Sequence, residues 1–274
     1  MATVSISKSA IFELIMAALE AYAIKHDRES KVAIETFAHL WGSHNKRLPF
    51  KCNVEHISIE TSAKRRRDSV STQYISLDLK KDIARVFGEG YNHLGNFHTH
   101  PYFKDEDKNK NKKDNTYTAN KIRTKKLFNF SGQDHLSEIN ESTIEVGKHS
   151  FSVALVMTVF AMERADDRAD GCIDSNLYEL SLGNIKLWLK AQVFEHKQKS
   201  CLTDDELNDF SIYGLDASNY NDHDTLPIPV TTDIDCDFLY SGTYLEGFGR
   251  IVIGDKKATY KDTKAAEKRL YHTV

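Results

Sequence analysis

The sequence contains few cysteines, few glycines and prolines, and almost no excess of charge. Its 274 residues include four cysteines, which are far apart and form no Cys-x-x-Cys pair, so a disulfide framework and a cysteine-based zinc site are both disfavoured. Thirteen glycines and four prolines are too few for a collagen-like or low-complexity chain. The net charge of −3 provides no overall field that would attract nucleic acid or a membrane surface. The composition indicates a globular protein of a reducing compartment, and we expect it in the cytoplasm.

Long hydrophobic runs are also missing. The longest nearly apolar run, Phe151 to Met162, has twelve residues, whereas a helix needs roughly 20 to cross a bilayer. Near the N-terminus, Glu13 and Glu20 interrupt the apolar residues, so no export signal is expected. We therefore expect no membrane partner, and we interpret residues 151–160 as a buried strand.

Hydrophobic periodicity predicts an α/β (α+β) fold in which helices sandwich a mixed β-sheet. Residues 3–7 alternate as in a strand, and apolar residues from Ile11 to Tyr22 recur with helical spacing. The patterns predict further strands at 32–42, 54–60, 70–77, 94–99, 151–160 and 185–194, and helices at 79–87 and from Gly132 onward. We assign residues 1–199 to the main domain and residues 200–274 to a C-terminal extension packed on it.

Two segments are predicted to lack regular structure. Residues 104–126 are rich in lysine, asparagine and threonine and contain almost nothing apolar, so we expect a flexible loop. Leu226–Pro229 alternates proline with aliphatic residues, and we interpret it as an extended connection.

The first chemically informative motif is His98-Thr99-His100-Pro101. Histidines at positions i and i+2 of a strand point to the same face, so both imidazoles can bind one ion. The alternative is that the two histidines have this spacing by chance, since the chain contains twelve histidines. The proline that follows makes this alternative weaker, and we take His98 and His100 as candidate metal ligands.

Ser131-Gly132-Gln133-Asp134 offers a third ligand. Positions i and i+3 in the first turn of a helix share a face, so Asp134 can supply an oxygen while Ser131 lies beside it. A serine hydroxyl at that place can donate a hydrogen bond to a developing oxyanion. The alternative role of Ser131 is that of an ordinary helix N-cap.

Glu35 lies among apolar residues of the strand predicted at 32–42. Burial raises the pKa of a carboxyl group and suits it to proton transfer. The alternative is a carboxylate on the solvated face of an edge strand.

Together these motifs resemble the JAMM family of zinc proteases, also called MPN+ or JAB/Mov34 domains. The pattern of that family is a glutamate in a strand, then His-x-His-Pro, then Ser-x-x-Asp. Glu35 to Gly42, His98 to Pro101 and Ser131 to Asp134 are similar to these three segments, and the resemblance covers roughly residues 3–194. It implies the MPN/JAB fold, which is cytidine-deaminase-like, and a divergent bacterial or phage member would suit the weak similarity outside the motifs.

The resemblance also implies an activity. His98, His100 and Asp134 would bind one catalytic Zn²⁺, Glu35 would activate water, and Ser131 would help to hold the oxyanion. The protein would be a zinc-dependent isopeptidase or peptidase that cleaves at the C-terminus of ubiquitin or a ubiquitin-like modifier. Its partner would be that modifier or its conjugate.

Several departures and alternatives accompany this interpretation. Residues 104–126 fall between His100 and Ser131 where the family has a much shorter connection, so they resemble an insertion. Phe130 stands where the family tends to have proline, and Ala38 replaces a usual glycine. One alternative is a non-catalytic MPN scaffold. Another alternative is nucleic-acid binding through Lys64 to Arg67 and the lysine-rich loop. It is less favoured because these stretches lack interleaved aromatic residues apart from Tyr117.

Overall fold

The computed structural model describes residues 1–24, 33–66, 68–88, 91–103, 117–162 and 170–241. Its strands are β1 (Ala2–Ile6), β2 (Phe37–His44), β3 (Lys51–Ile59), β4 (Lys64–Arg65), β5 (Val70–Ser71), β6 (Asn92–Tyr102), β7 (Ile144–Val146), β8 (His149–Ala161), β9 (Gly171–Asp174), β10 (Leu177–Leu182), β11 (Ile185–Gln198), β12 (Thr225–Val230) and β13 (Thr232–Asp235). Its α-helices are α1 (Lys8–Ala23), α2 (Tyr74–Phe87), α3 (Ala119–Thr124), α4 (Gly132–Glu138), α5 (Asp204–Ile212) and α6 (Asp237–Ser241). Two short 3-10 helices are η1 (Lys199–Cys201) and η2 (Ala217–Asn219).

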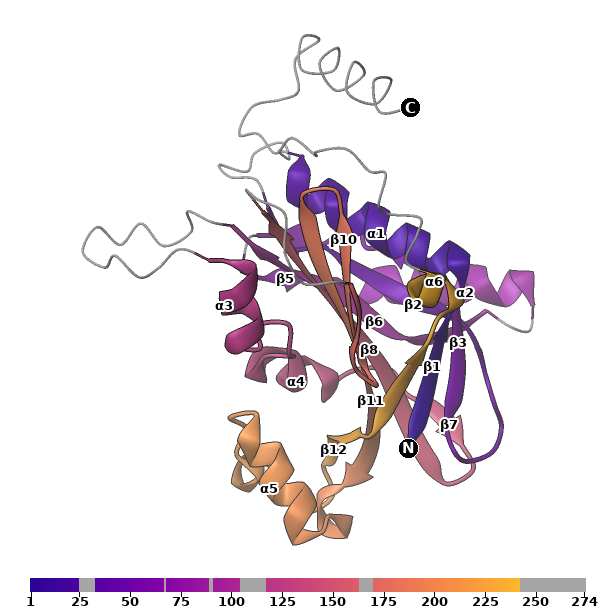
Figure 1. Cartoon of the computed structure of the whole chain (residues 1–274). Coiled ribbons are helices and arrows are strands. Elements are labelled where there is room, and N and C mark those ends of the chain that lie inside the picture. Colours follow the sequence, from indigo (N-terminus) through magenta and orange to yellow (C-terminus); the bar gives the residue numbers. More distant parts are fainter. Residues whose placement is uncertain (25–32, 67, 89–90, 104–116, 163–169, 242–274) are drawn as a thin grey trace, which may run out of the picture.

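One mixed sheet of eleven strands forms the framework (Figure 1). Nine of its strands follow the order β13-β1-β3-β2-β6-β8-β11-β10-β9, while β12 pairs with β11 and β7 with β8. The pairs β1–β3, β1–β13 and β6–β8 are parallel, and the other pairs are antiparallel. Helices flank this curled sheet. The predicted fold class, a mixed sheet with helices around it, is therefore confirmed as a class.

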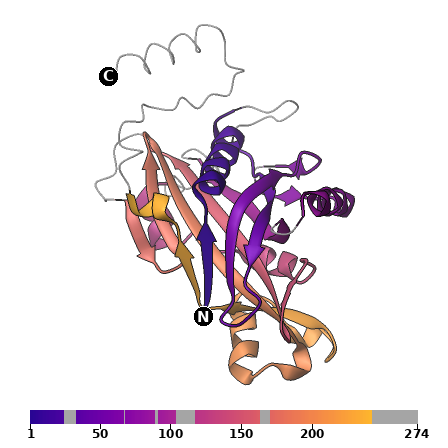
Figure 2. The ribbon, with the colours of Figure 1, turned by 90° about the vertical axis from the view of Figure 1, so that its right-hand side faces the viewer.

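Helix α1 lies in the hollow of the sheet, between its two arms (Figure 2). Ser7 caps the helix by accepting a hydrogen bond of 3.1 Å from the Ala10 amide. Ile11, Leu14 and Tyr22 lie on the helix face that packs into the main core. The strand and helix predicted at the start of the chain are therefore confirmed, and burial of this face stabilises the curl of the sheet.

The part of the C-terminal segment that the structure describes joins both arms of the sheet. Strand β12 pairs with β11, and β13, which begins two residues after β12 ends, pairs with β1. The Thr232 hydroxyl also accepts a hydrogen bond of 3.0 Å from the Val193 amide. Residues 225–235 thus belong to the main sheet, and the prediction that 226–229 lacks regular structure is wrong. Residues 242–274 lie outside the described residues.

The predicted strand at 70–77 is also wrong. Val70 and Ser71 form a two-residue strand, and helix α2 begins at Tyr74, whereas the predicted helix began at residue 79. Helix α2 has no buried residue, so the alternation of residues 70–77 did not reflect a sheet face. In Figure 2, α2 lies outside the curled sheet on the side of β2 and β3.

The flexible loop predicted at 104–126 is contradicted in its second half. Residues 119–124 form helix α3, whose Ile122 packs with Phe128 and Trp188 in a small core of its own. Arg123 donates a hydrogen bond of 3.0 Å to Glu179, which is buried in β10. One apolar side chain and one buried ion pair therefore outweigh the polar composition of the segment. Residues 104–116 lie outside the described residues.

Among the described residues, no helix combines the length and the apolar character needed to cross a membrane.

Candidate metal centre

Strand β6 holds the two candidate histidines in the middle of the sheet. It lies between β2 and β8, and its pairing with β8 runs from Gly95 to Tyr102. His98 and His100 point to the same face, and their Nε2 atoms lie 3.1 Å apart. The strand is longer than the predicted 94–99, since β6 continues through Pro101 to Tyr102. The fixed backbone of a central strand thus positions both imidazoles.

Helix α4 supplies the third candidate ligand. The Ser131 hydroxyl accepts a hydrogen bond of 3.2 Å from the Asp134 amide, and the Asp134 carboxylate accepts one from the Ser131 amide, which is a capping box. This turn directs Asp134 toward β6. Its Oδ1 lies 3.1 Å from Nε2 of His98, and its Oδ2 lies 3.3 Å from Nε2 of His100.

These three side chains form a group that can hold a metal ion. Their ligand atoms all lie within 4.8 Å of one another. The two imidazole nitrogens are 3.1 Å apart, and each lies 3.1 or 3.3 Å from a different oxygen of the Asp134 carboxylate. Ligand atoms at about 2.0–2.2 Å from a tetrahedral ion are about 3.3–3.5 Å apart, so the observed spacing suits such an ion with little adjustment. Two histidines and one carboxylate are a donor set that zinc uses in catalytic sites, although other divalent ions accept these ligands as well.

The electrostatics of the group favour the states that bind metal. Burial lowers the pKa of His98, so its ring is neutral at neutral pH and offers a lone pair. Burial by itself would raise the pKa of Asp134, but hydrogen bonds with His100 and His98 hold it well below its usual range. A neutral imidazole and an ionised carboxylate are the forms that bind divalent ions.

Helix α4 is held against the sheet by a buried polar network that the sequence did not reveal. Glu138, one turn beyond Asp134, accepts hydrogen bonds of 2.7 Å from the side-chain NH₂ group of Asn96 and 2.9 Å from the Ser152 hydroxyl. His196 lies 2.8 Å from that hydroxyl, and Asn96 also donates to Glu141. Burial, together with the charge of Glu141, raises the pKa of Glu138 to about 8. The network fixes α4 on β6 and β8, and so fixes Asp134 relative to His98.

The C-terminal segment covers the other side of α4. Tyr213 stacks on His135 with ring centroids 3.5 Å apart, and Phe194 meets the same imidazole edge-on. A Cβ atom on Gly132 would lie 2.4 Å from the Tyr213 carbonyl oxygen, so the first turn of α4 requires glycine here. Residues after 200 therefore help to place the candidate metal ligand.

Glu35 lies just before β2, not within it as predicted. Phe37 pairs with His98, and the Thr36 amide donates a hydrogen bond of 2.9 Å to the Thr99 hydroxyl. These contacts hold the residues just before β2 beside the part of β6 that carries the two histidines. The side chain is half-buried, and burial, with the charges of Asp134 and Asp68, raises its pKa to about 8. The structure thus brings the predicted acid to the predicted ligands, although the strand boundary was wrong.

Ser131 is exposed, and its hydroxyl caps α4. Ser131 is thus a helix N-cap, the alternative role predicted for it from the sequence. In this role its oxygen accepts a hydrogen bond, and the hydroxyl proton can still donate to another group. Phe130, where the family pattern has proline, packs edge-on to His98 with ring centroids 6.2 Å apart. It closes one side of the histidine pair with an apolar surface.

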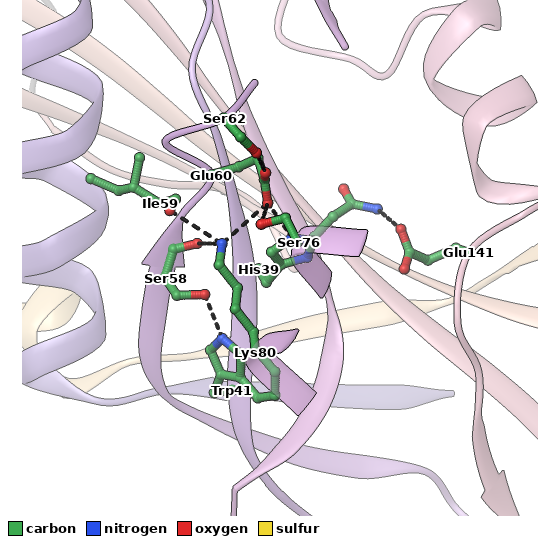
Figure 3. A network of polar contacts seen from close by, with 10 residues as sticks. His39, Trp41, Ser58, Ile59, Glu60, Ser62, Ser76, Lys80 and Glu141 are labelled. Carbon is green, nitrogen blue, oxygen red and sulfur yellow. Dashed lines mark hydrogen bonds and ion pairs between the residues drawn. The ribbon is translucent and has the colours of Figure 1, made fainter. Parts of the chain in front are cut away.

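A second buried cluster of histidine and carboxylate lies at the far end of β3 (Figure 3). Glu60 is fully buried and interacts with His39 at 3.0 Å, Ser76 at 2.7 Å and Lys80 at 3.2 Å, and it also accepts a hydrogen bond from Ser62. These hydrogen bonds outweigh burial and lower the pKa of Glu60 to about 2. The lysine neutralises the carboxylate, so this cluster has no need of an ion.

No protein-family model matches the sequence, and no curated protein matches it either. The relation to the JAMM family therefore stays a prediction.

Proposed function

We propose that the protein is a zinc-dependent isopeptidase or peptidase with an MPN/JAB-type fold. The observation that supports this most strongly is the convergence of His98, His100 and Asp134, with Glu35 close enough for the charge of Asp134 to raise its pKa. Together with Ser131, these four positions are the ones that the JAMM pattern specifies. A scaffold protein would not need three convergent ligand atoms beside a half-buried acid.

His98, His100 and Asp134 would hold the ion. Zn²⁺, when bound, supplies Lewis acidity that makes water a usable nucleophile near neutral pH. Glu35 orients the water, accepts its proton and delivers that proton to the leaving amine. A cation nearby shifts the raised pKa of Glu35 back toward neutrality, the range in which a carboxyl group can both accept and donate.

Ser131 has a secondary role in this proposal. Its hydroxyl donates a hydrogen bond to the oxyanion that develops on the attacked carbonyl, while its oxygen still caps α4. The substrate is ubiquitin or a ubiquitin-like protein, free or conjugated, as the resemblance implies. The four cysteines are unpaired, in keeping with the cytoplasm as the compartment.

Metal content and hydrolysis test the proposal together. Emission spectroscopy on protein purified without chelator should give about one zinc per chain, and the double variant His98→Ala/His100→Ala should contain none. The matched control is His223→Ala, an exposed histidine outside the site, which should keep its zinc. Glu35→Gln should also keep zinc but lose about 10²- to 10⁴-fold in the hydrolysis of a ubiquitin-like conjugate.

Two results would contradict the proposal. A native protein without zinc after reconstitution would remove the metal site. A zinc-loaded protein that cleaves no modifier conjugate would instead support the non-catalytic scaffold.

A further inference from the structure

Strand β8 carries two hydroxyl groups in its buried part. Residues 151–160 are otherwise apolar, and Ser152 and Thr158 are both fully buried. Because they are six residues apart, both side chains lie on the same face of the sheet. The Ser152 hydroxyl is used there, since it donates to Glu138 of α4 and lies 2.8 Å from His196. The Thr158 hydroxyl, in contrast, has no hydrogen-bond partner among the described residues.

A second buried atom without a partner lies on the neighbouring strand. His100 of β6 pairs with Thr158 of β8 in parallel register, so the two side chains stand next to each other on one face. The Nε2 atom of His100 faces Asp134 at 3.3 Å and His98 at 3.1 Å. Its Nδ1 atom is buried and has no hydrogen-bond partner within the described part of the chain. Two unpaired polar groups thus occupy neighbouring positions of one sheet.

The other neighbours of these two side chains do not compete for the hydrogen bond. The pairing between β2 and β6 runs from Asn92 to His98, so β8 is the one described strand that pairs with His100 (Figure 1). On its other side Thr158 pairs with Trp188 of β11, whose indole N–H already donates to a carboxylate at 2.7 Å. An indole has no other polar atom. The imidazole of His100 is therefore the polar neighbour that the sheet leaves for the Thr158 hydroxyl.

A hydroxyl group is unfavourable at this position unless it forms a hydrogen bond. Burial removes it from water, whereas a valine has nearly the same shape and no polar atom to satisfy. Neighbouring strands are about 4.8 Å apart, and rotation about the Cα–Cβ bond of a threonine moves its oxygen among three staggered positions. A hydrogen bond with the imidazole offsets the cost of burial for both groups.

We propose that the Thr158 hydroxyl forms a hydrogen bond with Nδ1 of His100 and so positions this imidazole for metal binding. The inference rests on the proposed function in one respect, because it assumes that His100 binds the ion through Nε2. A histidine that binds metal through Nε2 carries its proton on Nδ1 and usually donates it to a neighbouring acceptor, which fixes the ring and raises its basicity. The Thr158 oxygen can accept this hydrogen bond, so Thr158 is a positioning residue that acts through His100.

Strand β8 then supports two of the three candidate ligands. Ser152 holds α4, and with it Asp134, through the carboxylate of Glu138. Thr158 holds His100 from the neighbouring strand. Both hydroxyls belong to one strand that is paired on both sides, with β6 and with β11. The positions of the two ligands are therefore set by the sheet before an ion binds.

The zinc affinity of two Thr158 variants tests the proposal. Thr158→Val keeps the shape of the side chain but removes the hydroxyl, and competition with a chelator should show zinc binding about 10- to 100-fold weaker than in the native protein. Thr158→Ser keeps the hydroxyl and should restore most of that loss. Native affinity in Thr158→Val, or an equal loss in both variants, would overturn the inference, because the hydroxyl would then have no part in metal binding.

Thr232→Val is the matched control. Thr232 is also a buried threonine of this sheet, but its hydroxyl accepts from the Val193 amide and donates to the Val230 carbonyl. Its replacement should lower the urea concentration at which the metal-free protein unfolds and leave the zinc affinity unchanged. Weaker zinc binding in Thr232→Val as well would show that the Thr158 variant acts through general stability, and would overturn the inference.

Nitrogen-15 NMR of histidine-labelled protein separates this inference from the proposed function. The Nδ1 signal of His100, identified by its absence in His100→Gln, should shift between the native protein and Thr158→Val, with or without zinc. A shift in a native protein that binds no zinc would support the contact and contradict the metal site. Bound zinc with an unshifted Nδ1 signal would instead support the metal site and overturn the contact.

Discussion

Two buried clusters of histidine and carboxylate lie only a few residues apart along neighbouring strands, and they differ in what surrounds the carboxylate. Glu60 meets a histidine, two serines and a lysine, so its charge and its hydrogen bonds are satisfied within the protein. Asp134 meets His98 and His100, and no lysine or arginine in the described part of the chain forms an ion pair with it. A closed cluster stabilises structure, whereas convergent ligand atoms without a cation are suited to an ion.

The largest effect on stability is expected from removing Glu60, the carboxylate at the centre of the fully paired cluster. Glu60→Ala leaves Lys80, His39 and two hydroxyls without their shared partner, and the free energy of unfolding should fall by about 3 kcal/mol. Urea unfolding measures this change. Zinc content should stay at its native value, because no metal ligand is touched.

Glu20→Ala is the control for that experiment. Glu20 is exposed on α1, and its replacement should change the free energy of unfolding by less than about 0.5 kcal/mol. Loss of zinc from Glu60→Ala would show that the two clusters depend on each other. It would contradict the distinction between a structural cluster at Glu60 and a metal centre at Asp134.

A smaller effect is expected from a change that weakens the support of Asp134 but leaves the candidate metal ligands His98, His100 and Asp134 in place. Glu138→Ala removes the acceptor that ties α4 to Asn96 and Ser152, so Asp134 should be held less precisely. Supporting residues of this kind typically contribute 10- to 100-fold to metal affinity. Competition with a chelator measures the zinc affinity. Gln133→Ala, an exposed position on the same helix, should leave it unchanged.

The two regions should also differ in the sign of their pH dependence. The folded-state pKa of Glu60 is about 2, below its ordinary value of 4.5, so its stabilisation is complete above pH 4.5 and is lost as the pH falls toward 2. The folded-state pKa of Glu138 is about 8, above its ordinary value, so its protonated form stabilises the fold below pH 4.5, and this contribution is lost as the pH rises through 8.

Glutamine variants separate these two contributions. Glu60→Gln should flatten the change in unfolding free energy between pH 4.5 and 2, and Glu138→Gln should flatten it between pH 4.5 and 8. Each change of slope corresponds to at most one proton, or about 1.4 kcal/mol per pH unit. Identical pH profiles for both variants would show that the surroundings of the two carboxylates do not differ in the way described.

Much of the candidate site could be predicted because its parts are local. Two histidines separated by one residue share a face of any strand, and Ser131 with Asp134 makes a capping box in any helix that begins there. Helix α1 and strands β8 and β11 were predictable for the same reason, since their hydrophobic patterns are long and regular.

The errors arose where distant contacts outweigh local composition. Helix α3 forms in a polar segment because Ile122 and Arg123 find partners on β10 and β11. Strand β12 contains Pro227 and Pro229, yet it pairs only with β11 among the described strands. Prolines two residues apart lack their N–H groups on the same edge, so β12 can bond to β11 through its other edge.

The sequence by itself determined which atoms can bind a metal and which short elements carry them, because capping and alternation act within a few residues. Only the tertiary structure decided that these atoms meet. The pairing of β2 with β6 brings Glu35, just before β2, near the charge of Asp134. The contacts of Glu138 with Asn96 and Ser152 place Asp134 at His98. Register and helix docking depend on residues far apart in the chain, whose contacts become favourable only after the sheet has formed.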